Sequence, residues 1–519
     1  MIRSTKKLRF YYFSFLKHDF KASISVFFVA LPLCLGVALA SNAPVYSGLI
    51  AGIIGGIVIG LLSKSSLSVS GPAAGLTAIC AAAITKMGAI EIFFLSVSIG
   101  GILQLLLGIF RLGGFTHLIP SSVIKGMLAA IGLILISKQV PLLIGYDKPD
   151  FWRGEFVNLL TFQHGFKGIT NLYESISIGA ILIGFLCLSL LIAWEKYLSK
   201  KFRAIPVSFI LVLFAALLAI LFKNFLPLLA LTDAQFVSVP QNVFGTIRLP
   251  DFSSLFSNAE IWKNAVIICF VASLETLLSI EAIDKIDPYN RITPQNRELI
   301  AQGTGNILSG LIGGLPITAV IVRSSANAEA GAKTKLSAIT HGIWLIIALL
   351  IAIPLINKIP YTVLAVILIK TGFGLTKPSM IRGVYRQGRE QFMPFIVTVI
   401  AILFTDLLIV VLIGIGYAVY FLVKHTYRAG FTMNEKQEGH IRHYHIDLAL
   451  NVSFLNKKKL RDTLDVIPEY SIVDVFGSRS VYIDHDILEI IQDYKVKAKN
   501  KHIELRLQDI PEVETIELH

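Results

Sequence analysis

One acidic residue lies in the middle of an apolar segment, where a charge is costly. Glu275 belongs to the segment 262–283, and Ser279 follows it one helical turn later. A carboxylate and a hydroxyl on one helix face can bind Na⁺, and the carboxylate can also take up a proton. The pair predicts a site for a coupling Na⁺ or H⁺. The alternative is a structural ion pair or hydrogen bond.

Two stretches rich in Gly and Pro interrupt apolar segments at corresponding places in two halves of the chain. The first is 68–75 and the second is 313–318. A helix that begins inside a membrane leaves its first N–H groups unpaired at the positive end of its dipole, which favours an anion. Matched interruptions of this kind are typical of a transporter binding site. The alternative is that these residues only kink helices or allow close packing.

A second charged residue, Arg323, is expected about two turns into the segment that begins at 316. It would add positive potential to an anion site or reach the cytoplasmic interface. Glu281 and Asp284 are expected in solvent or paired with Lys285. The histidines are scattered, and no P-loop or Ser/His/Asp arrangement occurs, so we expect a transporter without an organic cofactor and not an enzyme.

The composition places these residues in a bilayer. Of 519 residues, 54% are hydrophobic and only 16% are charged. A helix that crosses the hydrocarbon core needs about 20 apolar residues. By this criterion we predict about fourteen spans, at 22–41, 44–62, 70–87, 91–110, 118–137, 174–196, 204–230, 262–283, 297–313, 316–328, 335–356, 360–376, 391–405 and 406–424.

The basic residues predict the direction of the spans, because cytoplasmic loops hold the excess of Lys and Arg. With the N-terminus inside, alternate loops are basic, whereas the loops 138–173 and 231–261 are poor in Lys and Arg. We therefore expect a multi-pass protein of the cell inner membrane with both termini in the cytoplasm. The basic residues of the predicted inner loops are Arg111, Lys196, Lys200, Lys201, Arg203, Lys285, Arg291, Lys333, Lys335, Lys377, Arg382, Arg386 and Arg389.

The chain divides into an N-terminal segment at 1–21, a transmembrane domain at 22–428 and a small α/β domain at 437–519. In the last, strands are predicted at 443–455, 471–476 and 502–507, with helices at 457–466 and 484–497. The net charge of +13 lies mainly between apolar segments, so no nucleic-acid partner is expected. The four cysteines lie inside apolar segments and are expected to pack there.

These residues together resemble the SulP family of anion permeases and exchangers, whose members carry a C-terminal STAS domain. The resemblance extends over nearly the whole chain. It rests on residues 30–33 with 42–44, on 69–72, on Glu275, on 313–316 with Arg323, and on 331–336.

The resemblance implies a seven-plus-seven inverted repeat, divided into core and gate domains, with an elevator-like motion and a homodimer. It places the anion between the starts of the third and tenth spans, and Glu275 and Ser279 at the coupling site. Apolar Ala73 and Ile321 stand where some relatives have hydroxyls, which leaves recognition mainly to backbone amides. The implied substrate-binding residues are Leu33, Val37, Ala73, Ala74, Ala319, Val320, Ile321 and Arg323.

The leading hypothesis is cation-coupled uptake of a small inorganic anion, with bicarbonate and sulfate favoured equally. Exchange of chloride or dicarboxylates and a nucleobase permease of similar architecture remain alternatives within transport. A regulatory scaffold anchored by its spans is the alternative from another class. The STAS-like domain is expected to bind a cytoplasmic regulatory partner. Because 484–486 lacks a serine, no phosphorylation switch is expected there.

Overall fold

The computed structural model describes residues 2–114, 121–145, 176–198, 206–404, 427, 430–438 and 441–511. It divides into two compact units, Met1–Val411 and Leu412–His519, which are described separately.

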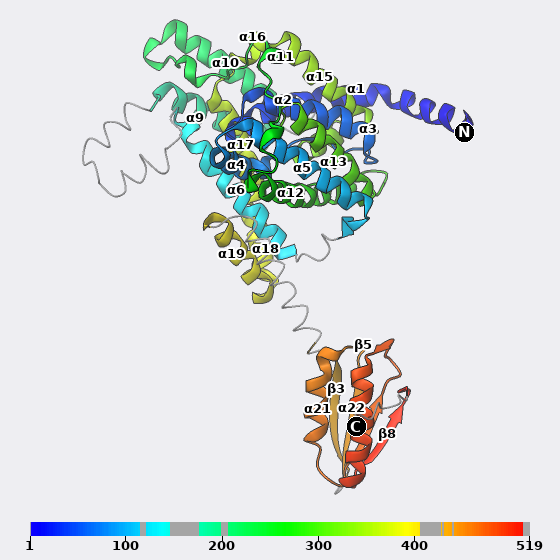
Figure 1. The fold of residues 1–519 in the computed structure, drawn as a ribbon. Helices are drawn as coiled ribbons and strands as arrows, with labels where there is room; N and C mark the ends of the chain where they lie inside the picture. Colours follow the sequence, from blue (N-terminus) through cyan, green and yellow to red (C-terminus); the bar gives the residue numbers. More distant parts are fainter. Residues whose placement is uncertain are drawn as a thin grey trace, which may run out of the picture. The chain divides into compact units, whose positions relative to one another are not determined.

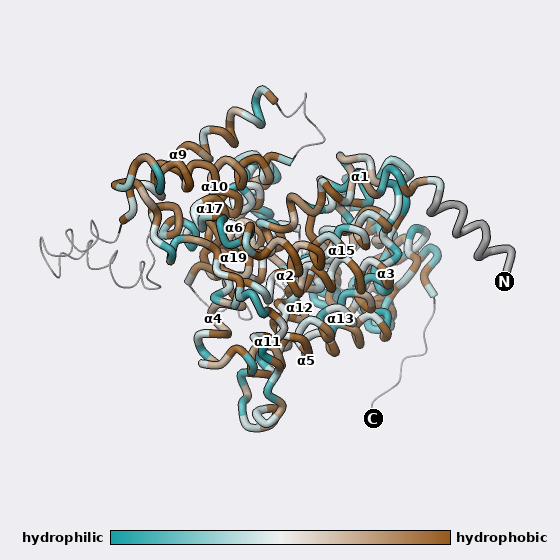
Figure 2. Tube along the Cα trace, turned by 90° about the horizontal axis from the view of Figure 1, so that it is seen from above, coloured by the Kyte–Doolittle hydropathy of each residue, from teal (hydrophilic) through white to brown (hydrophobic). Residues whose placement is uncertain are grey.

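The first unit is built from apolar helices (Figure 1), and most of its ordered backbone is α-helix. The 90° view in Figure 2 shows that hydrophobic residues follow helices such as α9 and α10 at the outside of this unit. The principal helices are α1 (Ile2–Ala40), α2 (Val45–Ile54), α4 (Thr77–Met87), α5 (Ile90–Ile109), α6 (Ser121–Leu143), α9 (Ile178–Ala193), α10 (Val207–Phe225), α12 (Ala259–Asp284), α13 (Gln295–Leu311), α14 (Ile321–Glu329), α15 (Leu336–Ile351), α16 (Ile353–Ile356), α17 (Tyr361–Leu375), α18 (Pro378–Arg386) and α19 (Arg389–Phe404).

Each of the first thirteen predicted spans overlaps at least one of these helices, which confirms a helical polytopic membrane protein. The fourteenth, 406–424, lies outside the described residues. Within the described ranges, eight helical stretches are long and apolar enough to cross a membrane, and α15 is shorter. The number of fourteen spans therefore stays a prediction.

The helix contacts repeat between the two halves. α1 packs against α15, and its counterpart α12 packs against α5. α5 also packs closely against α13, where Gly101 and Gly303 let the two backbones approach: a Cβ on Gly303 would lie 2.5 Å from the Leu105 nitrogen. Small residues are what such close helix packing in a membrane requires.

The two Gly/Pro-rich stretches contribute short strands, which corrects the prediction that helical spans begin at residues 70 and 316. Strand β1 (Ser70–Pro72) pairs antiparallel with β2 (Ile317–Ala319), with Ser70 opposite Ala319 and Pro72 opposite Ile317. After β1 a 3₁₀ turn, Ala74–Leu76, leads into α4; after β2 the chain enters α14 at Ile321. The helices therefore start several residues later than predicted.

The second unit is the predicted α/β domain (Figure 1). Its four-stranded sheet has the order β3-β4-β6-β8, formed by β3 (Phe431–Glu438), β4 (Ile441–Leu448), β6 (Ile472–Phe476) and β8 (Glu504–Gln508). β4, β6 and β8 run parallel, and β3 is antiparallel to β4. Helices α21 (Lys457–Asp465) and α22 (His485–Asn500) cover the sheet with an apolar core.

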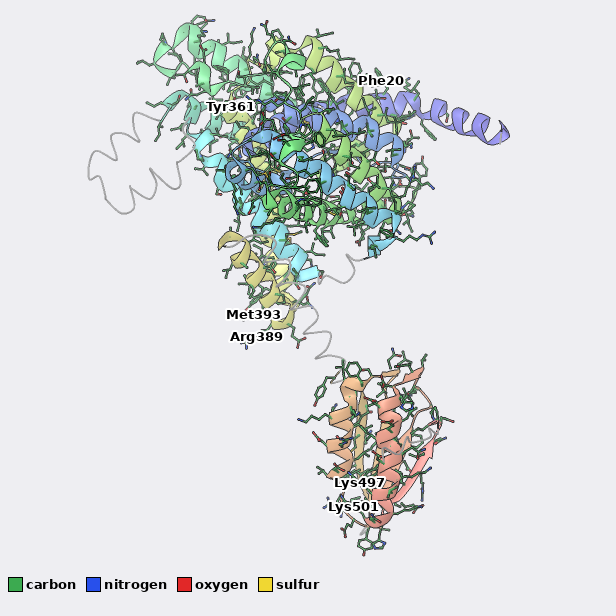
Figure 3. The ribbon with its side chains drawn as sticks, viewed as in Figure 1. Phe20, Tyr361, Arg389, Met393, Lys497 and Lys501 are labelled. Carbon is green, nitrogen blue, oxygen red and sulfur yellow. The ribbon has the colours of Figure 1, made fainter. Side chains whose placement is uncertain are left out.

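The predicted strand and helix order of this domain is confirmed, but β3 was missed. It begins at Phe431, before the boundary predicted at 437, so the sheet includes residues ahead of that boundary. Hydrogen bonds join the C-terminal ends of α21 and α22 (Figure 3). The Lys497 ammonium donates to the Asp465 carboxylate, and the Lys501 ammonium donates to the backbone carbonyls of Asp465 and Ile467. These cations lie at the C-terminal end of α22, where the helix dipole favours them.

Candidate functional site

The strand pair joins the two interrupted segments at the centre of the first unit. The Val320 N–H donates to the Val69 carbonyl at 3.1 Å, and the Ala73 N–H donates to the Pro316 carbonyl at 3.3 Å. All six strand residues are buried. Because the strands are antiparallel, α4 leaves from one end of the pair and α14 from the other. The two helix starts therefore flank one small sheet.

The start of α14 is open on one side. Ile321 and Val322 are 38% and 43% exposed, whereas Arg323 and Ser324 are fully buried. Val320 forms no side-chain cap on α14, and Leu76 forms none on α4. First-turn N–H groups have no partner within their own helix. This leaves first-turn N–H groups of α14 for an anion, whereas ahead of α4 the Leu76 and Thr77 N–H groups already donate to the Ala73 and Ala74 carbonyls. That an anion binds at these two starts stays a prediction.

Arg323 lies in the first turn of α14, not two turns into a helix, because residues 317–319 form β2. It is 0% exposed, and its Nη2 lies 3.3 Å from the Cys34 sulfur. Nε and Nη1 have no hydrogen-bond partner among the described residues. The guanidinium lies against β1: a Cβ on Gly71 would be 2.0 Å from Nη1. A side chain on Gly71 would displace the guanidinium, whose positive charge raises the potential beside the strands.

Glu275 of α12 lies at the start of the other helix. A Cβ on Gly75 would be 2.9 Å from its Oε2, and the Gly75 backbone is a hydrogen-bond partner of the carboxylate. Oε2 itself is enclosed, with no partner in the described part of the chain. Ser279 is buried one turn further along α12. Thr276, which follows Glu275 in α12, accepts a hydrogen bond from the Ala319 N–H of β2 at 3.3 Å.

The other predicted site residues fall into three groups. Leu33 and Val37 of α1 are 4% and 2% exposed and share the main apolar core with Ala73, while Ala74 and Val320 are partly exposed. Ala319 instead packs with Leu277, Ile280 and Leu299 of α12 and α13. Its side chain therefore faces those helices, and it can serve an anion site only through its backbone. The Glu281–Lys285 pair is confirmed, with 2.7 Å between Nζ and Oε1.

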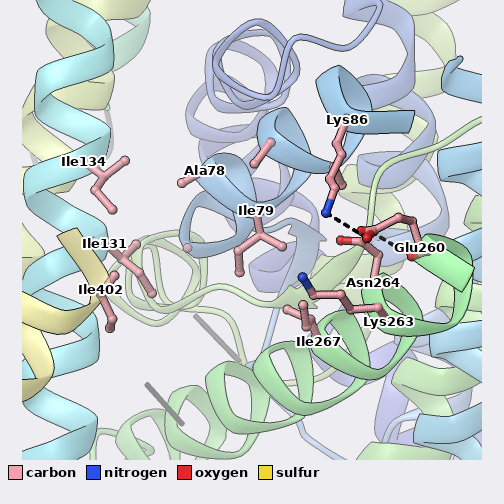
Figure 4. Close-up of a pocket in the computed structure, with 13 residues that line it drawn as sticks. Ala78, Ile79, Lys86, Ile131, Ile134, Glu260, Lys263, Asn264, Ile267 and Ile402 are labelled. Carbon is pink, nitrogen blue, oxygen red and sulfur yellow. Dashed lines mark hydrogen bonds and ion pairs between the residues drawn. The ribbon is translucent and has the colours of Figure 1, made fainter. Parts of the chain in front are cut away.

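A cavity of about 160 Å³ leads to Gly75 (Figure 4). One wall comes from α4 and α12, with small residues such as Ala78 near Gly75 and the Lys86–Glu260 ion pair at 2.7 Å. The opposite wall, from α6 and α19, consists of three isoleucines. The cavity thus has a wall with charged groups facing an apolar wall; the isoleucines are Ile131, Ile134 and Ile402.

Sequence reasoning missed three polar residues that hold the strands. Gln302 Nε2 donates to Ser70 Oγ at 2.7 Å, and Asn306 bonds both the N–H and the C=O of Ile317. Thr276 is the third. One feature of the sequence could have revealed two of these residues: Gln302 and Asn306 are four residues apart inside an apolar span, which places two amides on one helix face.

Known proteins similar to this chain share its architecture. Residues 16–401 match the family described as the sulfate permease family. The "Putative sulfate transporter YvdB" of Bacillus subtilis is 26% identical over 427 residues, 81% of this chain and 76% of that protein. The "Bicarbonate transporter BicA" of a Picosynechococcus strain is 24% identical over 418 residues, 78% of this chain and 70% of that protein.

Solved structures show the same fold at low sequence identity. The transmembrane domain of a cyanobacterial bicarbonate transporter BicA has a TM-score of 0.63 at 21% identity, over 78% of this chain and 97% of that one. SLC26A9 has a TM-score of 0.75 at 16% identity, over 98% of this chain and 88% of that one. With a family match over most of its length, the chain is a member of the sulfate permease (SulP) family, a family of transporters and not of enzymes, and carries a C-terminal STAS-like unit.

Proposed function

We propose that this chain is a secondary transporter of small inorganic anions, with sulfate and bicarbonate as the two leading substrates. The relatives named as sulfate and bicarbonate transporters support this proposal. The observation that carries it is the β1–β2 pair, which sets the uncapped starts of α4 and α14 at opposite ends of one small sheet. Backbone amides and the nearby Arg323 charge attract an anion there.

Glu275 supplies the coupling in this proposal. A carboxylate about 5 Å from a bound anion repels it by about 3 kcal/mol at an effective dielectric of about 20. A Na⁺ or H⁺ on Glu275 removes this repulsion, so cation and anion bind better together. By linkage each ligand raises the affinity of the other to the same extent.

The cavity in Figure 4 gives the proposed path. Its charged groups lie on the wall formed by α4 and α12, and the opposite wall of isoleucines belongs to α6 and α19. An apolar wall forms no hydrogen bonds that must break when the opposite wall slides, which suits an elevator-like motion of a core past a gate. The cavity would open outward, with the N-terminus, the C-terminus and the STAS-like unit in the cytoplasm of a homodimeric inner-membrane protein. That unit would bind a regulatory partner.

Uptake by proteoliposomes tests the proposal. Labelled sulfate or bicarbonate should accumulate in response to an inward Na⁺ or H⁺ gradient. Glu275→Gln should leave flux nearly independent of both gradients, since the neutral amide mimics a carboxylate that already carries its cation. Glu281→Gln is the matched control, because this exposed residue on the same helix forms an ion pair with Lys285 among the described residues.

Three other outcomes would change the proposal. No flux of either anion above empty vesicles would contradict anion transport of this kind. Uptake that requires an anion loaded inside would indicate exchange of chloride or dicarboxylates. Unaltered gradient dependence in Glu275→Gln would remove the coupling role from that residue.

A further inference from the structure

A stripe of polar side chains on α13 lies behind the strand pair. The polar stripe consists of Glu298, Gln302 and Asn306, spaced four residues apart and therefore on one face of the helix. All three are buried, with exposures of 0–1%. Buried polar groups in a membrane protein are costly unless they are hydrogen-bonded, and such residues are usually retained for function.

Each member of the polar stripe has a definite partner. Glu298 accepts from Ser63 Oγ at 2.5 Å and from Gln302 Nε2 at 3.0 Å. Gln302 Nε2 also donates to Ser70 Oγ at 2.7 Å. A carboxylate can only accept, so Glu298 fixes which end of the Gln302 amide faces Ser70. The chain Glu298–Gln302–Ser70 thus anchors β1 to α13.

Asn306 anchors β2 in the same way. Ile317 lies opposite Pro72 in the strand pair. The hydrogen bonds from Ala73 to Pro316 and from Val320 to Val69 show which pairs of the ladder are bonded. Because bonded and non-bonded pairs alternate, the N–H and C=O of Ile317 point away from β1. Asn306 takes both: Oδ1 accepts from the Ile317 N–H at 2.6 Å, and Nδ2 donates to the carbonyl at 3.1 Å. Nδ2 also donates to Gln104 of α5 at 2.8 Å. The Asn306 amide therefore makes the two hydrogen bonds with Ile317 that the backbone of a third strand would make at this edge of β2.

A sheet of three residues per strand cannot hold its own register, because short strands bury little surface and make few bonds. From these contacts we propose that Gln302 and Asn306 are positioning residues for anion binding. They fix β1 and β2, and through them the starts of α4 and α14, against α13. This inference rests on the proposed function: it assumes that the anion binds at those two helix starts.

Kinetics with sulfate and bicarbonate test this role. Gln302→Leu and Asn306→Leu should raise the KM of whichever anion the wild type transports about tenfold, with Vmax within about twofold, because misplaced amides weaken binding first. Thr304→Val is the matched control: it removes a hydroxyl that, within the described part of the chain, bonds the Ile300 carbonyl of its own helix and no other group. An unchanged KM in both leucine variants would overturn the proposal.

A double-mutant cycle shows whether Gln302 acts through β1. Ser70→Ala removes the hydroxyl that accepts the Gln302 hydrogen bond. Because this change is small, the variant should fold even if Asn306→Leu does not. Ser70→Ala should raise KM about as much as Gln302→Leu, and the double variant should be no worse than either. Additive effects would show that Gln302 acts elsewhere.

Hydrogen exchange separates this inference from the proposed function. Peptides containing 69–73 and 316–320 should exchange faster in Gln302→Leu and Asn306→Leu than in the wild type and Thr304→Val. If the wild type transports neither anion, the proposed function fails while this readout still decides whether the polar stripe holds the strands. Exchange equal to wild type in both leucine variants would contradict the positioning role.

Discussion

Gly75 and Glu275 approach so closely that any side chain on Gly75 would displace the carboxylate: a Cβ there would lie 2.9 Å from Oε2 and 3.0 Å from Oε1. These atoms are the end of a flexible side chain, so the carboxylate can yield without unfolding the site. The structure thus links the start of α4 to the proposed coupling residue through a single contact.

Gly75→Ala should therefore alter coupling more than stability. We expect the H⁺ concentration for half-maximal uptake to fall roughly fivefold, because the shifted carboxylate loses a backbone hydrogen bond that stabilises its charged form, worth about 1 kcal/mol. The melting temperature should stay within a few degrees of wild type. Gly374→Ala in α17 is the control, since a Cβ there meets nothing within 4 Å. Cation dependence unchanged in Gly75→Ala would show that the contact is not part of coupling.

Arg323→Met should discriminate between anions by charge. The guanidinium acts on the site through its potential, and the interaction of one charge with a dianion is twice that with a monoanion. A roughly tenfold rise in the bicarbonate KM should accompany a roughly hundredfold rise for sulfate. Thermal stability should not fall, because Nε and Nη1 have no partner among the described residues and a buried unpaired cation is costly. Equal effects on the two anions would argue against a through-space role.

Removal of the whole C-terminal unit should leave transport in place. The truncation should begin at residue 430, ahead of β3. A truncation at 437 would retain Phe431 and most of β3 but remove β4, the strand with which β3 pairs. We expect the variant lacking 430–519 to retain at least a measurable fraction of wild-type flux, with a truncation at 437 more prone to aggregate. Complete loss of flux in a well-folded variant lacking 430–519 would favour the scaffold alternative.

The sequence was a good guide to elements with strong periodic signals. Long apolar segments predicted the principal helices of the first unit except α18, which lies in a predicted loop. In the second unit, alternating residues predicted β4, an amphipathic pattern predicted α21 and a short apolar run predicted β6, and α22 and β8 were predicted as well. β3 was missed because it is an edge strand, and six of its residues, 432–437, are exposed, so its sequence lacks the alternation of a half-buried strand.

The site was predicted only in part. Gly71, Pro72 and Pro316 marked the interruptions, and Glu275 marked the proposed coupling position. Their strand pairing could not be foreseen, because three-residue strands carry no periodic pattern and their partners lie far apart in the chain. The roles of Gln302 and Asn306 likewise depend on that pairing, which no local pattern around them encodes.

The central claim is that an anion binds to backbone amides at the starts of α4 and α14. The most direct test is a crystal structure in the presence of selenate, an analogue of sulfate, with the ion located by its anomalous scattering. We predict a peak within about 2.7–3.2 Å of backbone nitrogens in the first turns that follow Ala73 and Val320. A selenate bound elsewhere in the first unit, with these two helix starts closed off from solvent, would contradict the account.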